Sequence, residues 1–176
     1  MVTRTATNVS VAMRSMLAAA LLPPVTHSVV ASATKSTCMS PTAHSLIQLI
    51  VSGFKKPNGV VNVWIYGGNA DDFLVRDKRI LRLKFPDPSD GPMAACIAVP
   101  GPGRYAVATH HDIESDGKRD MSDGIGFSGN PHLSVIRLKS GYAQTSFVVS
   151  SSVRRIDLRL NYRAGLSIKP VSPRTP

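Results

Sequence analysis

Acidic, aromatic and cysteine residues are all scarce in this chain of 176 residues. Only 11 Asp and Glu stand against 21 Lys and Arg, which gives a formal net charge of +10. Aromatic residues make up 6% of the sequence, with a single tryptophan, so no basic patch is interleaved with aromatic side chains. This composition disfavours nucleic acid as a partner. The positive charge favours an anionic envelope component instead, with solubility as the plain alternative.

A long uninterrupted apolar run is also lacking. Two prolines break the run Ser15–Val30, which is too short and too interrupted for a membrane-spanning helix. Positive charge precedes this run and the small-x-small sequence Ala31–Ala33 follows it, so residues 1–33 are predicted to be a cleaved signal peptide. The true start, Met1 or Met13, stays open. The sequence therefore predicts a periplasmic or secreted protein, from which cleavage would leave 143 of the 176 residues.

The only two cysteines, Cys38 and Cys96, both lie in the part expected to be exported. An even cysteine count in an oxidising compartment predicts one disulfide bond, and two buried free thiols are the alternative. Residues 34–44 are interpreted as a flexible lead-in to the folded domain.

From residue 45 onward, apolar residues recur at every second position in short runs, as in Val61, Val63 and Ile65. The sequence predicts an all-β fold, a single antiparallel β-sandwich of about 7–8 strands over residues 45–163 with a disordered tail at 164–176. The expected strands are Ser45–Val51, Val60–Tyr66, Ile80–Phe85, Met93–Val99, Arg104–His110, Leu133–Lys139, Thr145–Val149 and Arg155–Tyr162, with a short helical turn at Asp71–Val75.

Five of the 11 acidic residues gather between Asp112 and Asp123, which reverses the local charge. Oxygen-bearing side chains alternate around Gly117 with the spacing of a calcium-binding loop, in which this glycine makes the sharp turn. Glu114 and Asp123 depart from the usual residues at their positions. The alternative is a turn whose carboxylates accept backbone N–H bonds. The predicted Ca²⁺ ligands are Asp112, Glu114, Asp116, the carbonyl of Lys118, Asp120 and Asp123.

His110 and His111 end the strand before this loop, and strand geometry points them to opposite faces. His111 is interpreted as a hydrogen-bonded anchor for the loop, with a general base or a metal ligand as alternatives. Ser128 lacks the Gly-x-Ser-x-Gly pattern of a nucleophile elbow, so no catalytic residue is assigned. The residues expected to support the loop are His111, Gly117, Gly126, Phe127 and Ser128. The last two belong to the segment 127–131, which is expected to fold over the loop.

Several of these residues form a joint motif: Gly103–Ala108, His111-Asp112, Asp116-Gly117-Lys118 with Asp120, and Gly126-Phe127-Ser128. The motif resembles an uncharacterised bacterial family, the exported domain of unknown function number 2141. The resemblance covers about residues 45–163 and implies a periplasmic or secreted β-sandwich of transthyretin-like or Ig-like type. It implies no activity. Glu114 and Asp116 stand where the family commonly has asparagine.

Three functions follow from these observations. The first is a non-enzymatic envelope module, for binding or structure, that displays the acidic loop. The second is a binder of anionic envelope glycan or lipid, which requires Lys and Arg to cluster on one sheet face. The third is a metal-assisted hydrolase that uses His111 and Asp112, which requires an open cleft beside these two residues.

Overall fold

The computed structural model describes residues 38, 45–56, 58–88 and 90–171, all of which belong to one compact unit, Ser32–Pro176. Strands dominate this part of the chain, and the predicted all-β sandwich is confirmed. The predicted signal peptide at 1–33, and the predicted lead-in at 34–44 apart from Cys38, lie outside the described residues.

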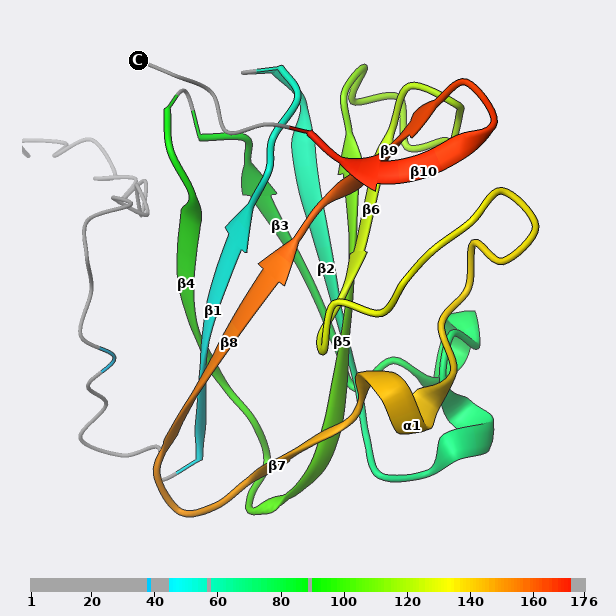
Figure 1. Cartoon of the computed structure of the whole chain (residues 1–176). Helices are drawn as coiled ribbons and strands as arrows, with labels where there is room; N and C mark the ends of the chain where they lie inside the picture. The colour runs from blue at the N-terminus through cyan, green and yellow to red at the C-terminus, as the bar shows by residue number, and fades with distance from the viewer. Residues whose placement is uncertain (1–37, 39–44, 57, 89, 172–176) are drawn as a thin grey trace, which may run out of the picture. The chain divides into compact units, whose positions relative to one another are not determined.

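Two sheets form the sandwich (Figure 1). The small sheet has the order β4-β1-β8, and the large sheet has the order β10-β9-β6-β5-β2-β3, with β7 paired to one end of β5. The strands are β1 (Leu46–Ser52), β2 (Val60–Tyr66), β3 (Leu81–Pro86), β4 (Met93–Ala98), β5 (Gly103–Asp112), β6 (Gly124–Phe127), β7 (Phe147–Val149), β8 (Val153–Arg159), β9 (Asn161–Ala164) and β10 (Ser167–Pro170).

Most strand pairs are antiparallel, as predicted, but β1 and β8 run parallel. About a hundred residues separate these two strands, so no tight hairpin forces them to run in opposite directions. Strand β5 changes its neighbour along its length. Its first residues, Gly103–Tyr105, pair with β7, whereas Ala108–His111 pair with β6.

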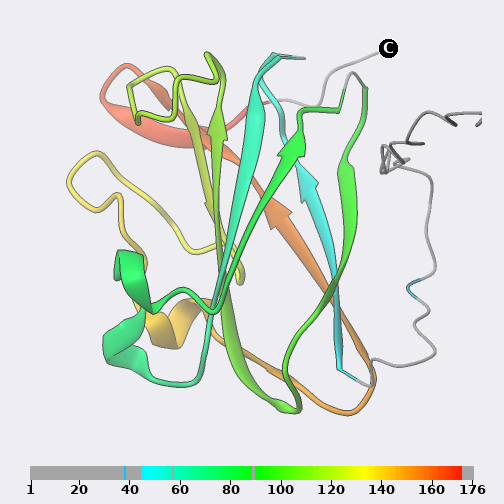
Figure 2. The ribbon, with the colours of Figure 1, turned by 180° about the vertical axis from the view of Figure 1, so that it is seen from behind.

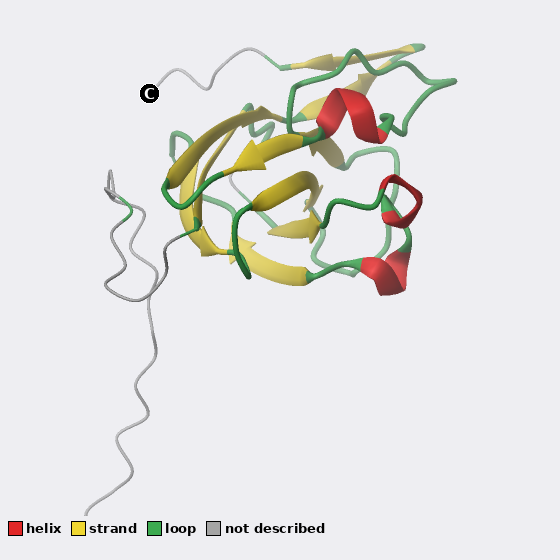
Figure 3. Ribbon diagram, turned by 90° about the horizontal axis from the view of Figure 1, so that it is seen from below, coloured by secondary structure: helices red, strands yellow, loops and turns green. Residues whose placement is uncertain are grey.

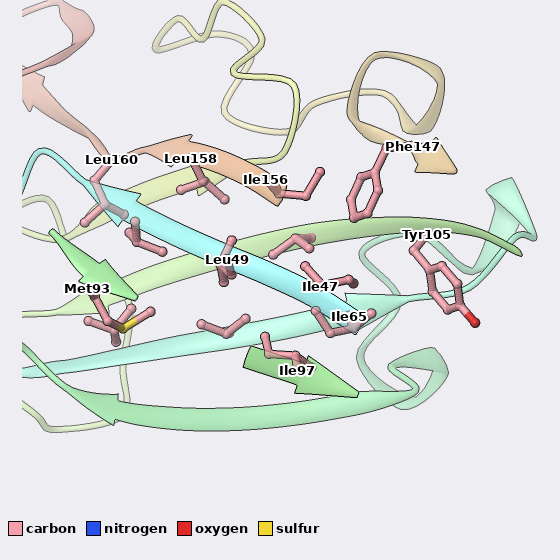
Figure 4. Close-up of a cluster of buried hydrophobic side chains, with 14 of the residues drawn as sticks. Ile47, Leu49, Ile65, Met93, Ile97, Tyr105, Phe147, Ile156, Leu158 and Leu160 are labelled. Carbon is pink, nitrogen blue, oxygen red and sulfur yellow. The ribbon is translucent and has the colours of Figure 1, made fainter. Parts of the chain in front are cut away.

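The core lies between the two sheets, where alternate residues of each strand meet (Figure 4). Ile47, Leu49 and Val51 of β1 are fully buried, and they face aliphatic residues of the large sheet. The period-two pattern of the sequence is therefore the direct cause of this packing, because successive strand residues point to opposite faces.

A second, smaller cluster of buried residues covers part of the outer face of the large sheet. Phe73 is its central ring, with edge contacts to Tyr66 at 5.3 Å and Tyr142 at 5.7 Å between ring centroids. The short helical segments η1 (Ala70–Asp72), η2 (Arg76–Lys78) and α1 (Tyr142–Thr145) gather on this side (Figure 3). None of the helices in the described residues is long and apolar enough to span a membrane.

Four local predictions are wrong. The predicted strand Arg155–Tyr162 is divided between β8 of the small sheet and β9 of the large sheet. The segment Leu133–Lys139 is not a strand, and a turn closed by bonds between Ser134 and Arg137 takes its place. Its apolar alternation resembles that of a strand, but no sheet edge pairs with it. The predicted strand Thr145–Val149 begins only at Phe147, after the helical turn α1.

The folded chain also extends past its predicted end at residue 163. Strand β10 pairs with β9 in antiparallel register, so residues 164–170 are not a disordered tail. Residues 172–176 lie outside the described residues. Strand β6 was not predicted, because two of its four residues, Gly124 and Gly126, have no side chain to show the period.

The predicted disulfide between Cys38 and Cys96 is confirmed. Cys96 lies in β4, so the bond ties Cys38 to the small sheet. The bond closes a loop with a sequence separation of 58. Loop entropy for such a separation corresponds to about 4 kcal/mol of stabilisation.

Candidate functional site

The acidic loop after β5 is folded by its own carboxylates. Asp112 accepts a hydrogen bond from the backbone N–H of Gly117 at 2.9 Å, which ties the strand end to the tip of the loop. Asp116 accepts one from the N–H of Lys118 at 2.8 Å. Gly117 has a φ of 75°, a left-handed conformation that glycine adopts without steric cost. The bond between Asp116 and Lys118 is that of an Asx turn, in which a short acidic side chain replaces a backbone partner.

The second half of the loop is held in the same way. The buried carboxylate of Asp123 accepts bonds from the N–H of Ile113 at 3.2 Å and from the N–H of Asp120 at 3.0 Å. It also lies 2.8 Å from Nε2 of His110. Asp120 accepts two bonds from Ser122, first from its hydroxyl and second from its backbone N–H, and these lower the pKa of the Asp120 carboxyl.

The loop therefore does not present its acids to a common point. Among the described residues, no group of three or more His, Cys, Asp or Glu side chains is placed to hold a metal ion. Glu114 and Asp116 are exposed to solvent. Asp112 is buried, and its Oδ1 has no hydrogen-bond partner among the described residues. Calcium binding by this loop stays a prediction.

His111 lies on the inner face of β5 and is fully buried. Its Nδ1 is 2.6 Å from the hydroxyl of Tyr162, and its Nε2 is 2.8 Å from the carbonyl of Asn58 and 3.1 Å from a carboxylate oxygen of Asp87. The neutral Nε2–H tautomer satisfies all three contacts, because Tyr162 then donates to Nδ1 and the ring donates to the two oxygens. His111 therefore anchors the end of β5 to the core and has no open face for a substrate.

The two glycines of β6 make room for this core. A Cβ at Gly124 would lie 2.6 Å from the ring of Tyr162, and a Cβ at Gly126 would lie 2.5 Å from a methyl group of Leu158. Such distances are far inside van der Waals contact, so side chains are excluded at both positions. Gly126 therefore supports the sheet rather than the acidic loop.

Phe127 is the last residue of β6 and pairs with Ala108, whereas Gly124 pairs with His111 beside the acidic loop. Phe127 and Ser128 therefore do not fold over this loop as predicted. Ser128 is fully buried. Its hydroxyl donates to the carbonyl of Thr145 at 2.7 Å and accepts from the N–H of Val107 at 2.9 Å. These bonds occupy the point where β5 changes its neighbour, while Phe127 packs in the outer cluster. Ser128 is a structural link and is not placed as a nucleophile.

His110 points the other way, onto the outer face of the large sheet. The strand register sets Asn62 between Lys84 and His110, and sets Trp64 beside Arg82. These five residues lie in two adjacent rows, because residues two apart on a strand share a face.

A groove of about 540 Å³ lies over this face. Asn62, Trp64 and His110 contribute to its floor. Its other lining residues come from the segment before β3, from β3 itself, and from the tip of the acidic loop. We call it the basic groove, after the six cationic side chains that line it: Arg76, Arg79, Arg82, Lys84, Lys118 and Arg119.

Aromatic contacts fix the centre of the groove. The Arg79 guanidinium lies 4.2 Å from the ring centroid of Trp64, and its Nε donates to the Tyr66 hydroxyl at 3.1 Å. The imidazole of His110 stacks beside the same indole at 6.1 Å with an angle of 19° between the rings. A cation held over an indole is attracted by the ring quadrupole, so Arg79 is pre-positioned rather than free to rotate.

Few of these cations form a salt bridge with a carboxylate. Arg82 lies 3.6 Å from Asp77, and both side chains are largely exposed. None of the other five cations takes part in a salt bridge within the described residues. Cations crowded around a groove raise the local concentration of anions, so the electrostatics of the site favour an anionic ligand.

The sequence matches a known protein family. The profile of DUF2141, described as an uncharacterized protein conserved in bacteria, matches residues 49–157. The chain belongs to this family. Comparisons with curated proteins and with solved structures gave no match.

The match to DUF2141 contains all of the basic groove but ends before Tyr162. Reasoning from the sequence missed the groove, although a signal was present. Five of the nine residues from Arg76 to Lys84 are basic. Arg82 and Lys84 alternate with apolar residues on β3, which is the pattern of a strand with one charged face.

Proposed function

We propose that this DUF2141 protein is a non-enzymatic module of the bacterial cell envelope that binds anionic groups in its basic groove. The observation that carries the proposal is the convergence of six cationic side chains on one groove of about 540 Å³. The disulfide between Cys38 and Cys96 supports an oxidising compartment, and so a periplasmic or secreted location.

The chemistry of the groove favours oxyanions as ligands. Four of its six cations are arginines, whose planar guanidinium groups match carboxylate and phosphate groups with two parallel hydrogen bonds. The ligand chemistry that fits is therefore a phosphate or a carboxylate, carried by an envelope glycan or by a lipid headgroup. The amide of Asn62 and the imidazole of His110 on the floor add polar partners for hydroxyl groups.

The hydrolase interpretation receives no support from the geometry. The side chain of His111 is 0% exposed, and Asp112 is 3% exposed. Neither residue lines the basic groove. His110 does line it, but its Nε2 is held by the buried carboxylate of Asp123.

Calorimetric titration with pyrophosphate and with trigalacturonate tests the proposal. The double variant Lys118→Ser/Arg119→Ser removes two cations at the exposed tip of the loop. We expect its affinity to fall about tenfold or more, because charge-assisted hydrogen bonds to the ligand are lost. Arg154→Ser is the matched control, since Arg154 is exposed on β8 of the other sheet. Equal affinities for the wild type and the double variant would reject the groove as the binding site.

Calcium binding is a second candidate function, favoured by the one unsatisfied oxygen of the acidic loop. Oδ1 of Asp112 is buried without a hydrogen-bond partner in the described residues. A buried carboxylate oxygen without a partner is unfavourable unless a cation or water reaches it. Calcium titration with thermal melting tests this candidate. Saturable heat and a raised melting temperature, both lost in Asp112→Asn, support it, whereas no heat with the wild type rejects it.

A further inference from the structure

The segment 134–139 projects from the outer face of the large sheet and is fixed at both ends. Leu133 precedes it and is 3% exposed in the outer cluster. Ser140 follows it and accepts a hydrogen bond from the Thr145 hydroxyl at 2.9 Å. The segment belongs to the yellow loop that stands clear of the strands in Figures 1 and 2. Because both ends are held in place, the projection has a defined position on the sheet.

The tip of the projection carries aliphatic residues, which are uncommon in β-turns and unfavourable in contact with water. The N–H of Arg137 donates to the carbonyl of Ser134 at 3.0 Å, which closes a β-turn with Val135 and Ile136 at its two central positions. Such positions are usually taken by Gly, Pro, Asn, Asp or Ser, and Val and Ile favour strands. The side chain of Ile136 is nonetheless 96% exposed, and Val135 is 37% exposed.

Cationic side chains flank this apolar tip. Arg137 and Lys139 are both exposed, and neither takes part in a salt bridge within the described residues. Leu138 between them is 43% exposed. An aliphatic tip with Lys and Arg directly behind it matches the boundary of an anionic bilayer, where acyl chains lie just below a layer of phosphates.

The projection is continuous with the basic groove. Leu138 and Lys139 line a small cavity of about 60 Å³ together with Trp64, Arg79 and Arg119. The last three of these residues also line the basic groove. One connected surface therefore contains the apolar tip, the two cations that follow it and the basic groove.

We infer that this surface docks the protein onto an anionic lipid bilayer, with Val135 and Ile136 inserted at the acyl boundary. The inference rests on the proposed function for the identity of the anion, which becomes the lipid phosphate held by the groove. Apolar insertion and electrostatic attraction add in such docking, since a short apolar tip alone holds a protein at a membrane only weakly.

Co-sedimentation with lipid vesicles tests the inference. The probes are vesicles of phosphatidylcholine alone and vesicles with equal parts of phosphatidylcholine and phosphatidylglycerol. We expect the full chain to bind the anionic vesicles only, and Ile136→Ser to weaken this binding about tenfold, because most of the inserted aliphatic surface is lost. Val153→Ser is the matched control, since Val153 is an exposed β-branched residue on the small sheet.

The outcomes distinguish docking on a bilayer from anion binding in the basic groove. Vesicle binding that is the same in Ile136→Ser and the wild type overturns the insertion. Pyrophosphate binding by a protein that ignores anionic vesicles overturns the docking and leaves the proposed function intact. Vesicle binding that depends on Ile136, in a protein that does not bind pyrophosphate, supports the insertion and rejects the groove as the anion site.

Discussion

His110 and His111 are adjacent in the sequence and both are buried beside a carboxylate, yet they point to opposite faces of the large sheet. His111 faces the core, where both of its ring nitrogens have partners and no solvent reaches it. His110 faces the basic groove, beside Trp64 and the cations that line this groove. The two faces of β5 thus separate a side that stabilises the fold from a side that we propose binds anions. Crowded cations repel one another and destabilise the compact state, so a face that keeps them indicates a function.

The same division runs through the acidic loop. Its carboxylates turn toward backbone N–H groups and shape the loop, whereas Lys118 and Arg119 at its tip line the groove. The acidic side chains therefore hold the shape of the loop, and the two cations are the part that we propose contacts a ligand.

The largest expected effect is on the inner face, at His111. The change His111→Ala leaves the carboxylate of Asp87 and the hydroxyl of Tyr162 buried without this partner. We expect the free energy of unfolding to fall by about 3–5 kcal/mol, because two buried polar groups, one of them a carboxylate, each lose a hydrogen-bond partner. Urea denaturation measures the loss, and pyrophosphate affinity of the remaining folded protein should stay within about twofold of wild type. A loss of pyrophosphate affinity without a loss of stability would assign His111 to the binding site instead of the core.

A steric change at the same face should have the next largest effect. In Gly124→Ala the new methyl group meets the ring of Tyr162, which His111 holds in place. Overpacking of this kind costs about 2–3 kcal/mol. The control is Gly67→Ala, because no atom lies within 4 Å of a Cβ at Gly67. Thermal melting of both variants measures the difference, and equal melting temperatures would refute the close packing of β6.

On the outer face, Arg79→Ala should affect binding more than folding. The variant loses the contact with Trp64 and the bond to Tyr66, which together contribute about 1 kcal/mol. Its affinity for pyrophosphate should fall about tenfold, since a pre-positioned guanidinium is removed. Parallel calorimetry and urea denaturation measure the two quantities. A stability loss as large as that of His111→Ala would place Arg79 in the scaffold instead of the ligand site.

The smallest expected effect concerns Asp120, a scaffold residue at the exposed end of the loop. Hydrogen bonds from the Ser122 hydroxyl and N–H lower the pKa of this carboxyl. A lowered pKa means that the ionised form stabilises the fold above the ordinary Asp pKa of about 3.9, and that this stability is lost as pH falls through the lowered value. Carboxyl titration by NMR should show the lowered pKa, and Ser122→Ala should raise it. An identical titration curve in the variant would show that the Ser122 hydroxyl does not lower the pKa of Asp120.

Much of the fold follows from local pattern, and most of the site does not. The alternation in Val60–Tyr66 predicts β2 with its observed bounds, because side-chain period is a property of the strand itself. The segment 134–139 shows the same alternation of apolar residues, but it has no partner strand and so forms no strand itself. The groove joins Trp64, the segment before β3 and Lys118, which are far apart in sequence and meet only through strand register. The contact between Asp87 and His111 is equally non-local.

The most direct test of the central claim uses the single tryptophan of the chain, Trp64, which lies in the floor of the groove. Its fluorescence should change saturably on titration with pyrophosphate, and the midpoint should move to higher concentration as salt screens the cations. The same titration of Lys118→Ser/Arg119→Ser should require about tenfold more pyrophosphate. Fluorescence that stays constant at every concentration of pyrophosphate, or that changes identically in the double variant, would contradict an anion site in the basic groove.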